Sequence, residues 1–208
     1  MAFGTGWYLF GLTQEPEEPP REERLDLRLP LRNAGFRRYL RVRVLLGLAG
    51  MAEPFYAVYA VRTLGQGQEL GLYLSLYALS FTLSNLLWAR LAEQGSKTVL
   101  QAGAFLALLA PLLALLLPRH LFGLVFLLQG AYLAALGLST TTYLLNLAPP
   151  EERSAFIGLA NTVAGAFAFA TVLGGWVADS LGFSGLFLLA ASFYAWAFYA
   201  GRKLPHEG

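Results

Sequence analysis

The chain has 208 residues, of which 56% are hydrophobic and 13% are charged, and its formal net charge is +2. Soluble domains carry about 25% charged residues, so this composition indicates a membrane protein whose principal surroundings are a lipid bilayer. The small net charge argues against a nucleic-acid partner. The lack of Cys excludes disulfides and thiolate ligands, and with only two His we expect neither a metal site nor a cofactor.

The first twelve residues, "MAFGTGWYLFGL", are mostly apolar. As a helix they would extend about 18 Å, which is too short to cross a hydrocarbon layer of roughly 30 Å. They lack the basic start and the small-residue cleavage site of a signal peptide. Two interpretations stay open: an interfacial helix, although it would lack a basic polar face, or the end of a longer membrane helix.

Residues 13–43 form a charged connection before the first long apolar stretch. Their first part is acidic and rich in Pro, which predicts an extended, solvated linker. Their second part alternates Arg with Leu, which predicts a short amphipathic segment on anionic headgroups. We therefore expect a cytoplasmic linker over this range.

Six apolar stretches follow, each of about the length that a membrane helix needs, roughly 20 residues. They cover residues 44–62, 70–92, 99–117, 121–147, 156–177 and 182–200. Short connections rich in Gly, Pro and charged residues separate them, which predicts an antiparallel helix bundle over 44–201. The expected fold is all-α and polytopic, with a tail at 202–208.

The distribution of Arg and Lys predicts how this bundle is oriented. If both termini are cytoplasmic, 13 of the 15 basic residues lie on cytoplasmic segments, and only Arg62 and Arg119 lie outside. An excess of Lys and Arg on cytoplasmic loops is the usual pattern in membrane proteins. We expect the chain to be a multi-pass protein of the cell membrane.

Polar residues within the apolar stretches are candidates for a transport site, since they are expensive in lipid and usually face a cavity or another helix. They fall in the first, second, fourth and fifth stretches, whereas the third and sixth are almost purely apolar. The candidates are Glu53, Asn85, Gln129 and Asn161, together with Tyr56 near Glu53.

Glu53 is the most informative of these residues because a buried acid costs about 2.5–3.5 kcal/mol at a helix centre. Pro54 follows it and removes a backbone donor, which is typical of a helix break beside a site. Two interpretations remain: a proton-coupling or cation-binding carboxylate, or a neutral acid hydrogen-bonded to a neighbouring helix. No Arg or Lys within the apolar stretches is available to pair with it.

Other features have mainly structural interpretations. Gly130 follows Gln129 and predicts a close approach between helices. Trp176, Tyr194, Trp196 and Tyr199 are interpreted as interfacial aromatic residues near helix ends.

Three stretches resemble the C-terminal half of a major facilitator superfamily transporter. In "NLLWARLAEQGSKTVLQAG", Gly95 and Lys97 match the family's cytoplasmic loop motif, Glu93 takes the place of its Asp, and Arg90 lies just upstream. The other two stretches are "APPEERSAFIGLANT" and "LGGWVADSLGFSGLFLLAA". The former resembles the loop and entry to the family's eleventh helix, and the latter resembles the stretch that joins its last two helices. The order and spacing of the three stretches, together with six spans of the right orientation, carry the resemblance.

The resemblance implies two inverted three-helix repeats, with the first two helices of each repeat lining a cavity. It also implies that residues 1–12 are the remnant of a preceding helix and that 13–43 are the central loop. The expected activity is secondary active transport of a small solute by alternating access. The expected partner is a missing N-terminal half or a second copy of the chain.

Enzymatic signatures are absent from the sequence. It contains no phosphate-binding Gly-Lys loop, no H-E-x-x-H and no G-x-S-x-G, and no mid-membrane His or Lys to activate a hydroxyl. We therefore expect no enzyme activity. The alternative to a transporter is a stand-alone six-helix membrane protein with a binding or assembly role.

Overall fold

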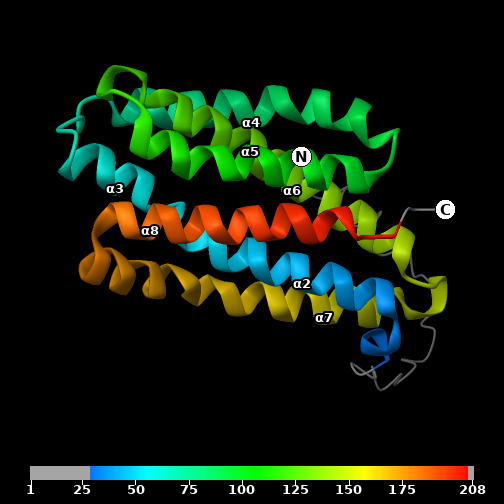
Figure 1. The fold of residues 1–208 in the computed structure, drawn as a ribbon. Helices are drawn as coiled ribbons and strands as arrows, with labels where there is room; N and C mark the ends of the chain where they lie inside the picture. Colours follow the sequence, from blue (N-terminus) through cyan, green and yellow to red (C-terminus); the bar gives the residue numbers. More distant parts are fainter. Residues whose placement is uncertain (1–28, 206–208) are drawn as a thin grey trace, which may run out of the picture.

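The computed structural model describes residues 29–205, and within that range all regular structure is helical (Figure 1). The short turn η1 (Pro30–Arg32) leads into α2 (Ala34–Ala49), which begins ten residues before the predicted start at 44. The Asn33 side chain caps this helix by accepting a hydrogen bond from the Phe36 N–H at 3.0 Å. The Arg-rich end of the predicted linker is therefore helical, whereas residues 1–12 lie outside the described range.

The second, third and fourth predicted stretches each correspond closely to one helix, whereas the fifth is interrupted and continues into the sixth. The remaining helices are α3 (Phe55–Arg62), α4 (Leu70–Ala92), α5 (Ser96–Leu116), α6 (Gly123–Leu147), α7 (Arg153–Ala166) and α8 (Ala170–Arg202). Four short 3-10 turns connect or interrupt them: η2 (Gly50–Ala52), η3 (Arg119–Leu121), η4 (Pro150–Glu152) and η5 (Phe167–Phe169).

Five helical segments within residues 29–205 are long and apolar enough to cross a membrane. They are Ala34–Arg62, Leu70–Ala92, Ser96–Leu116, Arg119–Leu147 and Pro150–Arg202. The last has 53 residues and would extend about 80 Å as one straight helix, more than twice the hydrocarbon thickness. The chain instead folds back at Gly182, whose φ of 71° and ψ of 174° are outside the helical region (Figure 1). A glycine tolerates this conformation because it has no Cβ.

Close contacts between a glycine on one helix and the backbone of another hold the helices together. A Cβ added at Gly130 on α6 would overlap the Tyr77 carbonyl oxygen of α4 and lie 2.9 Å from the Phe81 nitrogen. A Cβ added at Gly174 on α8 would likewise be too close to the Met51 carbonyl oxygen. Such small residues allow helix backbones to approach in a membrane, where lipid provides no hydrophobic drive for association. The close approach predicted at Gly130 is confirmed.

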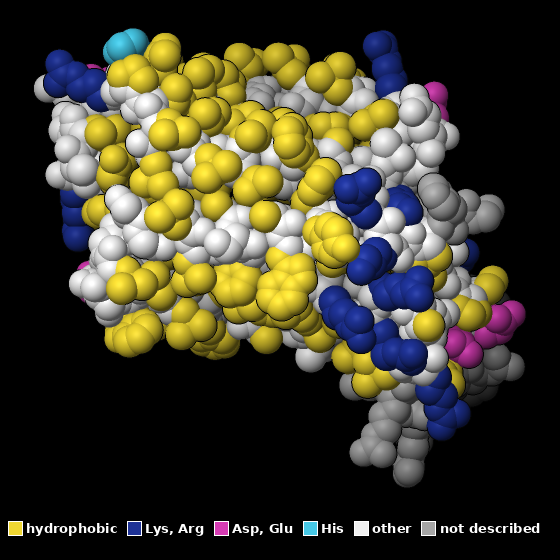
Figure 2. Space-filling view, in the orientation of Figure 1, with side chains coloured by type: hydrophobic (Ala, Val, Ile, Leu, Met, Phe, Trp, Pro, Cys, Tyr) yellow, Lys and Arg dark blue, Asp and Glu magenta, His cyan; other side chains and the backbone are white. Residues whose placement is uncertain are grey.

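Helix α4 leaves much of its apolar surface uncovered. Its exposed large side chains are Leu72, Leu74, Leu79, Phe81, Leu83, Leu86 and Leu87. The stretch around η5 and the start of α8 is similarly open, with Phe169, Val172, Leu173 and Trp176 exposed. Figure 2 shows hydrophobic side chains over most of the visible face, while basic ones gather at one end. Exposed apolar surface of this extent requires lipid or another protein to cover it.

The tight crossing of α4 and α6 predicts that Gly130→Ala destabilises the bundle. Overpacking of this kind costs about 1–3 kcal/mol, so the melting temperature of the purified chain in detergent should fall. The matched control is Gly137→Ala on the same helix, where an added Cβ meets nothing within 4 Å. Because Ala favours helix over Gly, the control should melt at the same temperature or higher. Equal effects of the two substitutions would contradict the crossing.

Candidate functional site

The first membrane segment is interrupted where α2 ends and α3 begins. Pro54 has no N–H to donate to the Gly50 carbonyl, which accepts instead from the Glu53 N–H at 3.1 Å. The tighter turn η2 forms here, and α3 resumes the helix at Phe55. The break predicted from Glu53 and Pro54 is therefore present, and it places the Glu53 side chain beside a cavity.

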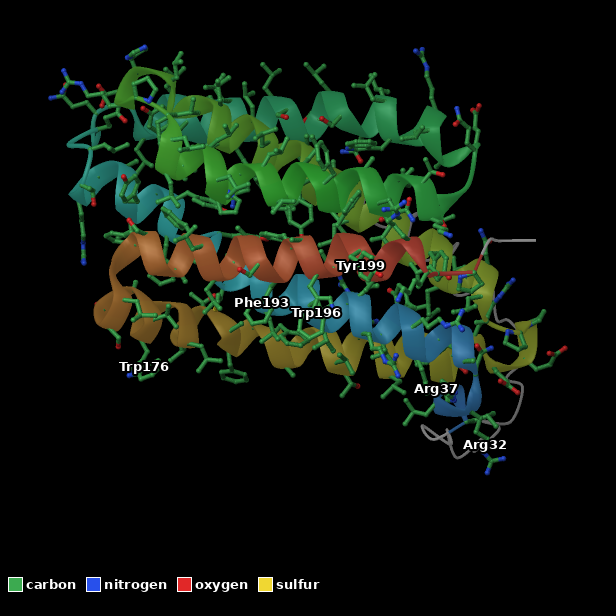
Figure 3. All side chains as sticks on the ribbon, viewed as in Figure 1. Arg32, Arg37, Trp176, Phe193, Trp196 and Tyr199 are labelled. Atoms are coloured by element: carbon green, nitrogen blue, oxygen red, sulfur yellow. The ribbon has the colours of Figure 1, made fainter. Side chains whose placement is uncertain are left out.

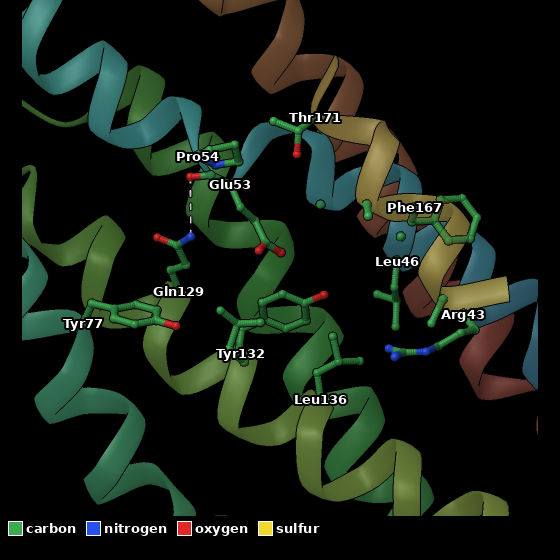
Figure 4. A pocket seen from close by; sticks show the side chains of 15 residues that line it. Arg43, Leu46, Glu53, Pro54, Tyr77, Gln129, Tyr132, Leu136, Phe167 and Thr171 are labelled. Atoms are coloured by element: carbon green, nitrogen blue, oxygen red, sulfur yellow. Dashed lines mark hydrogen bonds between the residues drawn. The ribbon is translucent and has the colours of Figure 1, made fainter. Parts of the chain in front are cut away.

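The cavity has a volume of about 630 Å³ and is lined by segments distant in sequence (Figure 4). Its polar or charged lining side chains are Arg43, Glu53, Tyr77, Gln129, Tyr132 and Thr171. They come from α2 and the break, from α4, from α6 and from α8. This volume lies within the usual range for small-molecule sites, about 300–1,000 Å³.

The Glu53 carboxylate has a hydrogen-bond donor from the far end of the chain. The Tyr194 hydroxyl on α8 donates to Glu53 Oε1 at 3.2 Å. Tyr194 is itself buried, and its ring packs edge-to-face against Tyr132 with centroids 5.6 Å apart. The interpretation of Tyr194 as an interfacial residue is therefore wrong, because the α8 helix turns its side chain into the bundle rather than toward the headgroups.

Gln129 also contacts the break. Its Nε2 lies 3.5 Å from the Glu53 carbonyl oxygen, which is a long hydrogen bond (Figure 4). The amide therefore partly satisfies a carbonyl at the point where the helical hydrogen-bond pattern is broken. Its side chain still lines the cavity, so a polar solute there has an amide within reach.

Tyr56 lies near Glu53 in the sequence, but its side chain is buried and does not face the cavity. Its side chain is 1% exposed and its ring lies 5.1 Å from the ring of Phe187. Its hydroxyl has no hydrogen-bond partner among residues 29–205. It does not line the cavity, so a direct solute contact would require rearrangement.

Arg43 is a cavity-lining residue that sequence reasoning missed. It was assigned to the linker, but α2 extends far enough to place it on the cavity wall. Arg43 and Glu53 line the same cavity, but no ion pair joins them among the described residues. The spacing of residues 43, 47, 50 and 54 marks one face of a helix and was the available signal. Ten residues of helix separate Arg43 from Glu53, about 15 Å along the axis, so the two charges lie at different depths.

Asn161 and Asn85 occupy different positions from Glu53. Asn161 lines a smaller neighbouring cavity of about 160 Å³, which shares Arg43 with the larger one. Asn85 lies on α4 and donates to the Phe81 carbonyl one turn earlier at 2.7 Å. The structure thus brings Asn161 near the site through Arg43 and leaves Asn85 outside both cavities.

The predicted loop motif connects α4 and α5. Gly95 has φ of 117°, which favours glycine, and it immediately precedes the first residue of α5. Lys97 Nζ donates to the Leu204 carbonyl at 2.6 Å, so this loop contacts the C-terminal segment. Arg90 and Glu93 are exposed. Within residues 29–205 no group of three or more His, Cys, Asp or Glu is arranged to hold a metal ion.

The long apolar helices, the uncovered apolar surfaces and the polar cavity at a helix break define a multi-pass membrane protein. The family model of the Major Facilitator Superfamily matches residues 44–206. The chain therefore belongs to this superfamily of transporters. No curated protein and no solved structure matches the chain.

The hydrogen bond between Tyr194 and Glu53 predicts that Tyr194→Phe lowers the stability of the bundle. Interhelical hydrogen bonds in membranes average about 0.6 kcal/mol and reach about 1.7, so a melting experiment in detergent should detect a small decrease. Tyr56→Phe is the control, because it removes a buried hydroxyl with no partner among the described residues and should be neutral or stabilising. A larger loss from Tyr56→Phe than from Tyr194→Phe would contradict the assignment.

Proposed function

We propose that this chain performs secondary active transport of a small solute by alternating access, as the C-terminal half of a major facilitator transporter in the cell membrane. The observation that carries the proposal is the Glu53 carboxylate, which lines a cavity with several polar side chains at a broken helix. Broken membrane helices with charged or polar groups at mid-depth are the usual sites of substrate and coupling ions in secondary transporters.

The proposed fold has six spans, which counts the two arms of Pro150–Arg202 separately because the chain reverses at Gly182. It would be built as two inverted repeats. The first is α2–α3, α4 and α5, and the second is α6, the α7–α8 arm before Gly182, and the arm after it.

The contacts between these helices come in equivalent pairs, which is the arrangement expected for two inverted repeats. The second helix of each repeat approaches the first helix of the other through a glycine contact, Gly130 against α4 and Gly174 against η2. The two third helices meet through Phe105 and Phe198, whose ring centroids are 5.9 Å apart. Each contact made by one repeat therefore has an equivalent in the other, which supports two repeats related by an axis in the membrane plane.

Orientation with cytoplasmic termini is supported by where the basic residues gather. The N-terminal end of α2, the α4–α5 loop and the end of α8 share one end of the bundle (Figures 1 and 2). Among residues 29–205, Arg62 and Arg119 lie on the connections at the opposite end. An excess of Arg and Lys identifies the cytoplasmic side.

The partner would be an N-terminal half or a second copy of this chain. Tyr77 of α4 and Thr171 of α8 line the cavity, and both α4 and the start of α8 carry exposed apolar side chains. A second bundle on those faces would complete the cavity wall and cover the apolar surface. Alternating access would then consist of the two bundles rocking about the site.

In this proposal Glu53 takes up the coupling proton, and Gln129 and Arg43 contact the solute. Protonation of Glu53 would offset the cost of a carboxylate in lipid, and Tyr194 would hold its orientation. The charge of Arg43 favours a solute with an anionic or strongly accepting group.

The prediction is that Glu53→Gln abolishes uptake driven by a pH gradient but spares solute exchange. The chain is reconstituted into vesicles with its partner bundle, and a panel of radiolabelled solutes is screened for uptake on acidifying one side. The neutral Gln keeps the shape and an acceptor for Tyr194 but binds no proton, so gradient-driven uptake should fall to the level of protein-free vesicles. Counterflow without a gradient should persist.

The matched control is Glu69→Gln, which neutralises an exposed acid on the connection between α3 and α4. It should leave both uptake and counterflow unchanged. If Glu53→Gln retained the full response to the pH gradient, Glu53 would have no role in coupling. If no solute in the panel were exchanged by the wild-type protein, transport by this bundle would be refuted for those solute classes.

A further inference from the structure

A second hollow lies between α2 and the C-terminal arm of α8, at the basic end of the bundle. It is a groove of about 590 Å³ on the outer surface. Its floor is apolar and includes Val44, Leu45 and Trp196, and its rim carries Arg41 and Lys203. Figure 3 shows Trp196 and Tyr199 along α8 beside α2. The groove therefore combines an apolar bed with two cations at one end.

Both rim cations are available to an anion. Arg41 and Lys203 are exposed, and no ion pair to either is found within residues 29–205. Lys203 Nζ lies 4.8 Å from the centroid of the Tyr199 ring, which holds the ammonium group over the groove. A cation held by a ring face still presents its N–H groups on the opposite side.

The spacing of two arginines indicates the depth of the rim. Arg41 precedes Arg62, at the other end of the segment Ala34–Arg62, by 21 residues, which would be about 31 Å as one uninterrupted helix. That length is close to the hydrocarbon thickness of roughly 30 Å, so we expect the two arginines near opposite surfaces of the bilayer. The apolar floor, which begins at Val44, lies on the hydrocarbon side of Arg41.

The groove faces away from the Glu53 cavity. Arg41 and Arg43 are two residues apart on α2, about 200° around the axis, so they point to opposite sides of the helix. Arg43 lines the cavity and Arg41 lines the groove. A bundle that completed the cavity would therefore leave the groove facing lipid.

We propose that this groove binds one anionic phospholipid. Its phosphate lies between Arg41 and Lys203, and an acyl chain lies along Val44, Leu45 and Trp196. Basic pockets between membrane helices at the bilayer surface select anionic headgroups in this way. The proposal depends on the chain being a multi-pass membrane protein and is independent of the role of Glu53.

Native mass spectrometry of the full chain in detergent tests this proposal. The probe is an equimolar mixture of phosphatidylglycerol and phosphatidylcholine of matched chains, and the readout is the ratio of the two bound lipids. The wild-type chain should retain phosphatidylglycerol preferentially. Each basic residue near an anionic lipid is worth about fivefold, so the double variant Arg41→Gln with Lys203→Gln should lower this preference about 25-fold.

A control double variant, Arg32→Gln with Arg153→Gln, removes the same charge from exposed positions outside the groove and should preserve the preference. Trp196→Ala should reduce binding of both lipids while leaving their ratio unchanged, because it alters the apolar floor alone. All variants change exposed side chains, and their melting temperatures check that they fold.

Three results would overturn the proposal. One is equal retention of the two lipids by the wild-type chain. Another is loss of the preference in the control variant as large as in the groove variant, which would indicate diffuse surface charge. The third is displacement of the bound lipid by inorganic phosphate at millimolar concentration, which would identify an anion site that makes no use of the acyl chain.

Discussion

The interruption of the first membrane segment at Pro54 is the constraint on which the rest of the site depends. Hydrocarbon offers no hydrogen bonds, so irregular backbone at membrane depth is tolerated only where protein or a water-filled cavity surrounds it. Here the surroundings come from two other helices: Gln129 on α6 approaches the Glu53 carbonyl, and Tyr194 on α8 donates to its carboxylate. The break therefore requires both helices in their observed positions.

The positions of α6 and α8 depend in turn on two glycines. Gly130 brings α6 against α4, and Gly174 brings α8 against η2, so the helices that contact the break are set by backbone approach. The alanine-rich face of α5 packs between α6 and α8 and contributes to the same arrangement. The close packing at these glycines thus fixes the geometry of the polar groups at the site.

Much of this fold could be predicted from the sequence because hydropathy reports length and depth directly. The bounds predicted for the second, third and fourth stretches lie within three residues of α4, α5 and α6. The first stretch began too late because its arginines lower the local hydropathy, although Asn33 offered a helix cap. The reversal at Gly182 lies at the predicted start of the sixth stretch.

The site was less predictable because its partners come from different helices. Glu53, Pro54 and Gln129 could be picked out from the sequence, because the cost of placing a polar group or a proline inside an apolar stretch is a property of that stretch alone. Tyr194 lies 141 residues from Glu53, and only the packing of α8 brings the two together. Arg43 lines the same cavity as Glu53, but it can be placed there only when α2 is extended past its apolar part.

The placement of Arg41 and Arg43 on opposite sides of α2 has a mechanical consequence. A helix turns about its axis as one body, so any rotation that moves Arg43 relative to the cavity sweeps Arg41 through the same angle on the outside. The guanidinium groups of Arg43 and Arg41 therefore move together. Through α2, a motion at the cavity is linked to a motion at the bilayer surface.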